Sequence, residues 1–146
     1  MATCKNVAEY FLSRVQEDVG DTISHLKLQK LVYYAQGFTL AITGEPLFDE
    51  TIKAWEHGPV TPSLYYEYKE FGGGAIPPCA QGSANGCFSP GQLEILDAVH
   101  EMYGQFSAWK LRNLTHEEEP WIEAYPDGII SRDSMKDYFK TLLVEE

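Results

Sequence analysis

The sequence lacks any run of about 18 consecutive apolar residues, the length that a membrane-spanning helix requires. Its first six residues, MATCKN, lead directly into an amphipathic pattern and contain no apolar signal-peptide core. These two absences predict a protein that stays in the cytoplasm and has no membrane partner.

Cysteine is scarce. Cys4, Cys79 and Cys87 include no Cys-x-x-Cys pair, and no histidine follows them at zinc-finger spacing. Cys79 and Cys87 could close a loop in an oxidising compartment, but nothing else in the sequence indicates export, so we expect three plain thiols. The four histidines are far apart along the chain, at positions 25, 57, 100 and 116. The sequence therefore predicts neither a metal site nor a cofactor.

Catalytic motifs are also missing. The sequence has no Gly-x-Ser-x-Gly elbow and no Cys–His nucleophile pair, and the glycines at 72–74 lack the Lys-Ser/Thr of a phosphate loop. Glu56 and His57 are adjacent, but neighbouring side chains of a strand point to opposite faces. We expect no catalytic residues. A small hydrolase or nucleotide-handling enzyme built around His57, His116 and a nearby glutamate is kept as a distant alternative.

Positive charge is in short supply. Eleven Lys and Arg residues face 22 Asp and Glu residues, which gives a net charge of −11. Such a surface repels a phosphate backbone unless the cations gather on one face, and here they are mostly scattered. Direct binding of nucleic acid is therefore disfavoured. A basic protein partner would be attracted, although the charge could equally serve only to keep the protein in solution.

Helical periodicity is abundant. Apolar residues recur at three- and four-residue steps, with Ser, Thr, Pro and Gly at the segment ends. The pattern predicts helices over about 5–16, 25–43, 62–71, 90–103, 108–114, from 120 and over 132–142. Gly37 lies inside the second helix at a cost of about 1 kcal/mol relative to Ala, so we expect a backbone or a bulky ring close to it. Met102 is expected to point inward with Ile95, Leu96 and Val99.

The period changes to two after the second helix. Ile52 and Ala54 alternate with Lys53 and Trp55, which predicts a short strand with residues 47–48 as its partner and a turn at 58–59. Residues 72–88 are rich in Gly, Pro and Ser and predict a mobile loop. We predict a mainly α (α+β) fold, in which residues 1–146 form a single compact helical domain with a small antiparallel β element inserted after the second helix.

Four segments in this order resemble the Panacea antitoxin domain family, which includes SocA-like and GepA-like phage-associated proteins. They are KLQKLVYYAQGFTLAITGEPLF at 27–48, IKAWEHGPVTPSLYYEYKEFG at 52–72, LRNLTHEEEPWIEAY at 111–125 and ISRDSMKDYF at 130–139. A single such helix would be a weak match. The Lys-Leu-Gln-Lys helix, the Trp-x-His-Gly-Pro segment and the Thr-His…Pro-Trp segment together make the resemblance specific.

The resemblance implies an antitoxin from a bacterial or prophage toxin–antitoxin system. Such a protein neutralises a cognate toxin, encoded by the adjacent gene, by direct stoichiometric protein–protein binding, and it is not an enzyme. Some relatives deliver their toxin to a protease, so a proteolytic adaptor is the alternative function. The toxins of the family are unrelated to one another, so the resemblance does not identify the toxin.

Aromatic residues together with Arg dominate interface hot spots, and tyrosine is plentiful here. Helical period predicts that Tyr33 and Tyr66 point outward. We expect the toxin to bind a face made of the Trp55 segment, Tyr66 and the acidic run before Pro120. Its residues are Trp55, Glu56, His57, Tyr66, Glu117, Glu118 and Glu119.

Overall fold

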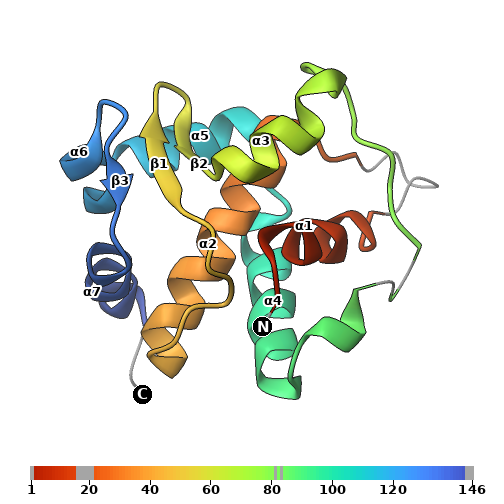
Figure 1. The fold of residues 1–146 in the computed structure, drawn as a ribbon, viewed down its shortest axis with the longest axis horizontal. Helices are drawn as coiled ribbons and strands as arrows, with labels where there is room; N and C mark the ends of the chain where they lie inside the picture. The colour runs from red at the N-terminus through yellow and green to blue at the C-terminus, as the bar shows by residue number, and fades with distance from the viewer. Residues whose placement is uncertain (1, 16–21, 81, 83, 144–146) are drawn as a thin grey trace.

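The computed structural model describes residues 2–15, 22–80, 82 and 84–143 (Figure 1). As predicted, the fold is mainly helical with a small antiparallel sheet. The helices are α1 (Cys4–Leu12), α2 (His25–Thr43), α3 (Pro62–Tyr68), α4 (Pro90–Tyr103), α5 (Ala108–His116), α6 (Glu119–Ala124) and α7 (Arg132–Leu142). The strands are β1 (Ile52–Trp55), β2 (Gly58–Val60) and β3 (Ile129–Ile130), and short 3-10 turns lie at Lys69–Phe71 and Asn85–Cys87.

Helix α2 is the centre of the molecule. It packs against α7, α4, α5 and α1, and Figure 1 shows it between α7 on one side and α1 and α4 on the other. Its ends are those that the sequence predicts, because Ser24 accepts a hydrogen bond from the Lys27 amide and Gly44 takes a left-handed φ of 82°. Since neighbours surround it, α2 buries more than one stripe. The prediction that Tyr33 points outward is therefore wrong, and Tyr33 is 1% exposed.

Gly37 allows α7 to approach α2 closely. A Cβ at this position would lie 2.6 Å from Phe139 Cζ and closer still to two other carbons of the same ring. The Phe139 ring also meets the Phe38 ring edge-on, with centroids 4.8 Å apart. The expected close approach of a bulky ring is confirmed.

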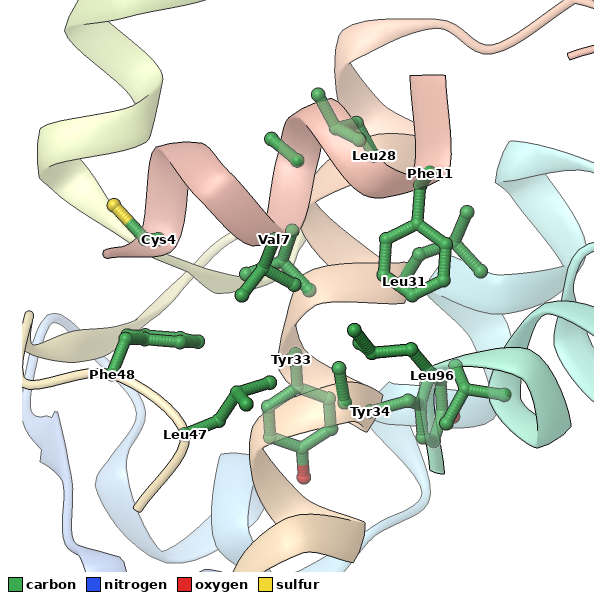
Figure 2. Close-up of a cluster of buried hydrophobic side chains, with 14 of the residues drawn as sticks. Cys4, Val7, Phe11, Leu28, Leu31, Tyr33, Tyr34, Leu47, Phe48 and Leu96 are labelled. Atoms are coloured by element: carbon green, nitrogen blue, oxygen red, sulfur yellow. The ribbon is translucent and has the colours of Figure 1, made fainter. Parts of the chain in front are cut away.

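The main apolar core lies where α1, α2 and α4 meet the segment before β1. Figure 2 shows Val7 and Phe11 of α1 facing Leu31 of α2, with Leu47 and Leu96 beside them. Ile95, Leu96 and Val99 are buried as predicted, but Met102 is not: it is 54% exposed, in the last turn of α4. The prediction for Met102 is wrong because apolar periodicity can continue to the end of a helix even where no neighbouring element covers that end.

The sheet has the order β2-β1-β3, and β1 is antiparallel to both neighbours. Trp55 pairs with Gly58, so Glu56 and His57 form the turn of the β1–β2 hairpin. Two predictions are corrected here. Gly58 and Pro59 belong to β2, an edge strand in which a proline without an N–H is tolerated. Residues 47–48 do not pair with β1, because Gln36 of α2 binds their backbone through both ends of its amide.

The Gly- and Pro-rich segment after α3 has no long helix or strand in its described part and is tied to the core at several points. The Ile76 amide donates to the Ile23 carbonyl at 2.9 Å, and the side chains of Ile76, Ala84 and Phe88 are buried. Cys4, Cys79 and Cys87 are free thiols. Across the described residues, no helix combines the length and the apolar character needed to cross a membrane.

Candidate functional site

The β1–β2 hairpin carries three of the residues that the sequence places in a binding face. Glu56 and His57 are exposed at its turn, and Trp55 is half-buried beside them. The Trp55 ring meets the Tyr65 ring of α3 edge-on, with centroids 5.2 Å apart. Figure 1 shows the hairpin between α3 on one side and α5 with α6 on the other. Three helices therefore flank the hairpin that carries this turn.

Two aromatic side chains from α5 and α6 hold the backbone of the turn. His116 lies with Nε2 2.6 Å from the Glu56 carbonyl and Nδ1 2.6 Å from the Arg112 carbonyl. Trp121 Nε1 donates to the Trp55 carbonyl at 2.8 Å, and its ring lies 4.0 Å from the His116 ring. The Thr-His…Pro-Trp segment thus fixes the Trp-x-His-Gly-Pro segment, far from it in sequence.

Two buried polar side chains of helix α2 form hydrogen bonds with backbone groups of β2 and of the residue that follows it. Gln29 accepts from the Thr61 amide at 2.9 Å and donates to the Thr61 carbonyl at 3.4 Å. Lys30 donates from Nζ to the Pro59 carbonyl at 3.2 Å. Burial, with a smaller contribution from Arg112, lowers the pKa of Lys30 to about 7. Gly58 is required here, because its φ is 114° and a Cβ would lie 2.5 Å from Lys30 Cε.

A cavity of about 380 Å³ lies beside the hairpin, between α2 and α3. Trp55, Tyr65 and His25 supply aromatic surface to it, and the His25 and Tyr65 rings lie 5.3 Å apart. Burial, and then the neighbouring Lys30, lowers the pKa of His25. Since the Gln29 amide nitrogen lies 3.0 Å from His25 Nε2, that ring nitrogen accepts the hydrogen bond. His57 lines the same cavity.

Three of the four histidines therefore meet around one hairpin, although they are far apart in sequence. Among the residues that the structure describes, however, no carboxylate is hydrogen-bonded to the ring of His57 or of His116. His57 Nδ1 accepts from Arg112 Nε at 3.1 Å, and both nitrogens of His116 face carbonyl oxygens. Nor do the described parts of the chain place three His, Cys, Asp or Glu residues where they could hold a metal ion. The geometry gives no support to the hydrolase hypothesis.

The remaining residues of the predicted face divide into exposed and buried ones. Tyr66 is 65% exposed, and Glu117 and Glu119 are exposed next to His116. Glu118 is buried, which corrects its placement in an exposed acidic run. It is the N-cap residue of α6, and its side chain turns inward to accept from the Tyr34 hydroxyl at 2.9 Å. Burial raises the pKa of Glu118 to about 7.

Sequence reasoning missed Arg112 as a member of this site. Its guanidinium carbon lies 4.5 Å from the Trp109 ring centroid, and its Nε holds His57. Residues three apart share one helix face, so the Trp109–Arg112 spacing was a usable signal. No sequence signal predicted the hydrogen bonds from Gln29 and Lys30 to the hairpin, because the periodicity of α2 does not show which of its polar side chains a hairpin covers.

The comparison with protein families decides what kind of chain this is. Residues 28–122 match the family described as antitoxin SocA-like, Panacea domain, and this range includes the hairpin with α3, α4 and α5. The chain belongs to the SocA-like Panacea family.

One curated relative of this Panacea chain is Antitoxin SocA of Caulobacter vibrioides (strain NA1000 / CB15N). The two are 49% identical over 43 residues, which is 30% of this chain and 23% of the relative. The similar segment therefore spans less than a quarter of that protein. No solved structure matches the chain.

Proposed function

We propose that this Panacea-family chain is an antitoxin that neutralises a protein toxin by direct, stoichiometric binding and without catalysis. The observation that carries the proposal is the family match, which runs through the residues that build and support the hairpin. The partner would be the toxin encoded by the adjacent gene, in a bacterial or prophage pair acting in the cytoplasm. We further propose that residues 1–146 form a single domain.

We place toxin binding on the hairpin face, defined here as Trp55, Glu56, His57, Tyr66, Glu117 and Glu119. Tyr66 gives this face an exposed aromatic ring, and large aromatic rings are frequent hot spots of protein interfaces. The exposed glutamates of this face, Glu56, Glu117 and Glu119, suit a basic partner, in keeping with the net charge of −11. Glu118 is left out because it is buried.

Co-expression with the product of the adjacent gene tests the proposal, scored by growth and by co-purification. Two exposed apolar side chains on different elements serve as a matched pair: Tyr66 on α3 and Met102 on α4. We expect wild-type chain to restore growth and to co-purify with the toxin. Tyr66→Ala should weaken the complex about tenfold or more, the effect of losing a hot-spot residue, while Met102→Ala leaves it unchanged.

Failure of the wild-type chain to rescue growth or to co-purify would contradict the proposal. The opposite result in the variants, with Met102→Ala weak and Tyr66→Ala normal, would move the toxin to the surface beside α4. If rescue requires a cellular protease and the toxin disappears, the chain is an adaptor and not an inhibitor.

A further inference from the structure

Lys30 carries a buried amino group without a counter-ion among the described residues. Its side chain has no exposed surface, and the Pro59 carbonyl is its hydrogen-bond acceptor. Within residues 2–15, 22–80, 82 and 84–143, no carboxylate forms an ion pair with it. An ammonium group has three N–H donors, and burying a charge without pairing is costly.

Holding the hairpin does not by itself require this charge. A single hydrogen bond to a carbonyl needs only a neutral donor. Gln29, the residue before Lys30, supplies such a donor from its side-chain amide to the Thr61 carbonyl. Positive charge here also opposes Arg112, which contributes to the lowered pKa of Lys30. With a pKa of about 7 the amine is only partly protonated at neutral pH, and it keeps N–H donors that the hairpin does not use.

The cavity next to Lys30 has the shape and chemistry of a small ligand site. Lys30 and Gln29 line it from α2, Leu26 and Val60 add apolar surface, and Trp55 and Tyr65 form an aromatic wall. His57 stands at its edge, held by Arg112. Few convergent polar groups on a mostly apolar wall are typical of sites for small ligands.

We infer that this cavity binds a carboxylate attached to an apolar or aromatic group, presented by the partner protein. The inference rests on the proposed function for the identity of the partner, but the chemistry of the ligand comes from the cavity alone. A carboxylate carries one negative charge, and by pairing with the Lys30 amine it would favour the protonated form of that amine. A phosphate dianion fits less well, because the cavity offers few donors for it and because Glu56, which also lines the cavity, repels a dianion more strongly than a monoanion.

Direct contact between the ligand and Lys30 requires the hairpin turn to move, because Lys30 is closed off from solvent. Glu56 and His57 form that turn and are exposed, so a ligand would displace them and would break the contacts of His116 with the Glu56 carbonyl and of Arg112 with His57. Binding should therefore be visible in their backbone amide signals and in the Trp55 indole signal.

The test is an NMR titration of the whole chain with small peptides, without any toxin. N-acetyl-phenylalanine carries a terminal carboxylate, and N-acetyl-phenylalanyl-glutamic acid α-amide carries only a side-chain carboxylate. N-acetyl-phenylalanine amide is the neutral control, and inorganic phosphate is the anion control. We expect saturable shifts at Trp55, Glu56 and His57 with one or both carboxylates at millimolar concentration. The dissociation constants of the amide and of phosphate should be at least tenfold higher. The stronger carboxylate identifies the source.

Lys30→Met keeps the bulk of the side chain and removes its charge, and Lys30→Gln keeps a donor for Pro59 if the methionine variant does not fold. Either folded variant should bind the carboxylate at least tenfold more weakly. Equal binding of the carboxylate and the amide, equal binding of phosphate, unchanged binding in the variants, or no binding by wild type up to about 20 mM would each overturn the inference. Because no toxin is present, these outcomes are separate from failure of the antitoxin function.

Discussion

At Gly37 one hydrogen atom in place of a methyl group decides how two helices pack. The Phe139 ring of α7 occupies the space that a Cβ on α2 would need. Tight interiors tolerate extra atoms poorly, because the surrounding side chains must leave their preferred rotamers. Gly37 therefore matters for contact and not for backbone conformation.

Gly37→Ala should lower the free energy of unfolding by about 1–3 kcal/mol, although alanine is the better helix former. Gly91 is the matched control, because it also lies in a helix and a Cβ there meets nothing within 4 Å. Gly91→Ala should be neutral or stabilising by up to about 1 kcal/mol. Urea unfolding of the two variants measures both effects, and equal stability of Gly37→Ala and wild type would refute the packing argument.

Glu118 should make stability fall as pH rises. Its pKa is raised from 4.5 to about 7 by burial, so the folded chain holds this proton more tightly than the unfolded chain. The resulting stabilisation is fully present below about pH 4.5 and is lost as pH rises through about 7. The loss is on the order of 3 kcal/mol for a shift of this size.

Glu118→Gln keeps an acceptor for the Tyr34 hydroxyl and removes the ionisation. The difference in unfolding free energy between this variant and wild type should therefore grow in favour of the variant between pH 4.5 and 8. Glu117→Gln, at an exposed neighbouring position, is the comparison variant and should show a weaker trend, because Glu117 makes only the smallest contribution to the raised pKa of Glu118. A pH-independent difference for Glu118→Gln would show that Glu118 is not held in its protonated form.

The starts of four helices were predictable because their signals are local, whereas α1 and α3 end at Leu12 and Tyr68, before the predicted end positions 16 and 71. Ser24, Ser89, Ser107 and Ser131 each accept a hydrogen bond from an amide three residues later, within the reach of one helical turn. The position of β3 was not predictable, because its two residues are defined only by pairing with β1 far earlier in the chain.

The sequence predicted which segments lie around the hairpin only in part. The Trp55 segment and the segment of the acidic run do adjoin, because His116 Nε2 lies 2.6 Å from the Glu56 carbonyl, but the inward turn of Glu118 depends on a tyrosine of α2. Similarly, the burial of Tyr33 reflects how many elements surround α2, which periodicity in one helix cannot report. The sequence signals identify the segments of the site, while tertiary contacts decide which side chains each segment exposes.

The attachment of the hairpin to α2 should depend on Gln29. Gln29→Leu leaves the buried Thr61 amide and carbonyl without this partner, and unsatisfied groups of this kind cost about 1–3 kcal/mol each. We expect a loss of about 2–4 kcal/mol in unfolding free energy, together with weaker toxin binding. Gln92→Leu removes an exposed capping contact with Ser89 and should cost about 1 kcal/mol or less. Chemical denaturation measures both losses of unfolding free energy. Similar losses for the two variants would contradict the claim that Gln29 attaches the hairpin to α2.

The net charge of −11 should act mainly on how fast a basic toxin associates. Raising the salt concentration from low values to about 0.5 M should slow association more than it speeds dissociation, because exposed charges steer encounter and are screened by salt. The double variant Glu117→Gln, Glu119→Gln should associate more slowly at low salt and depend less on salt than wild type. Stopped-flow or surface-based kinetics measures both rates, and a salt effect confined to dissociation would rule out steering.

The central claim is that the chain acts as a binder and not as a catalyst, and titration of purified toxin activity tests it most directly. A binder must be present in at least equal amount and leaves the toxin covalently intact. We therefore predict that toxin activity falls in proportion to added chain, reaches zero at about one to one for a tight complex, and that the recovered toxin has unchanged mass. Neutralisation at about one-tenth of the molar amount of toxin, or a changed toxin mass, would contradict the account, because only a catalyst turns over many toxin molecules.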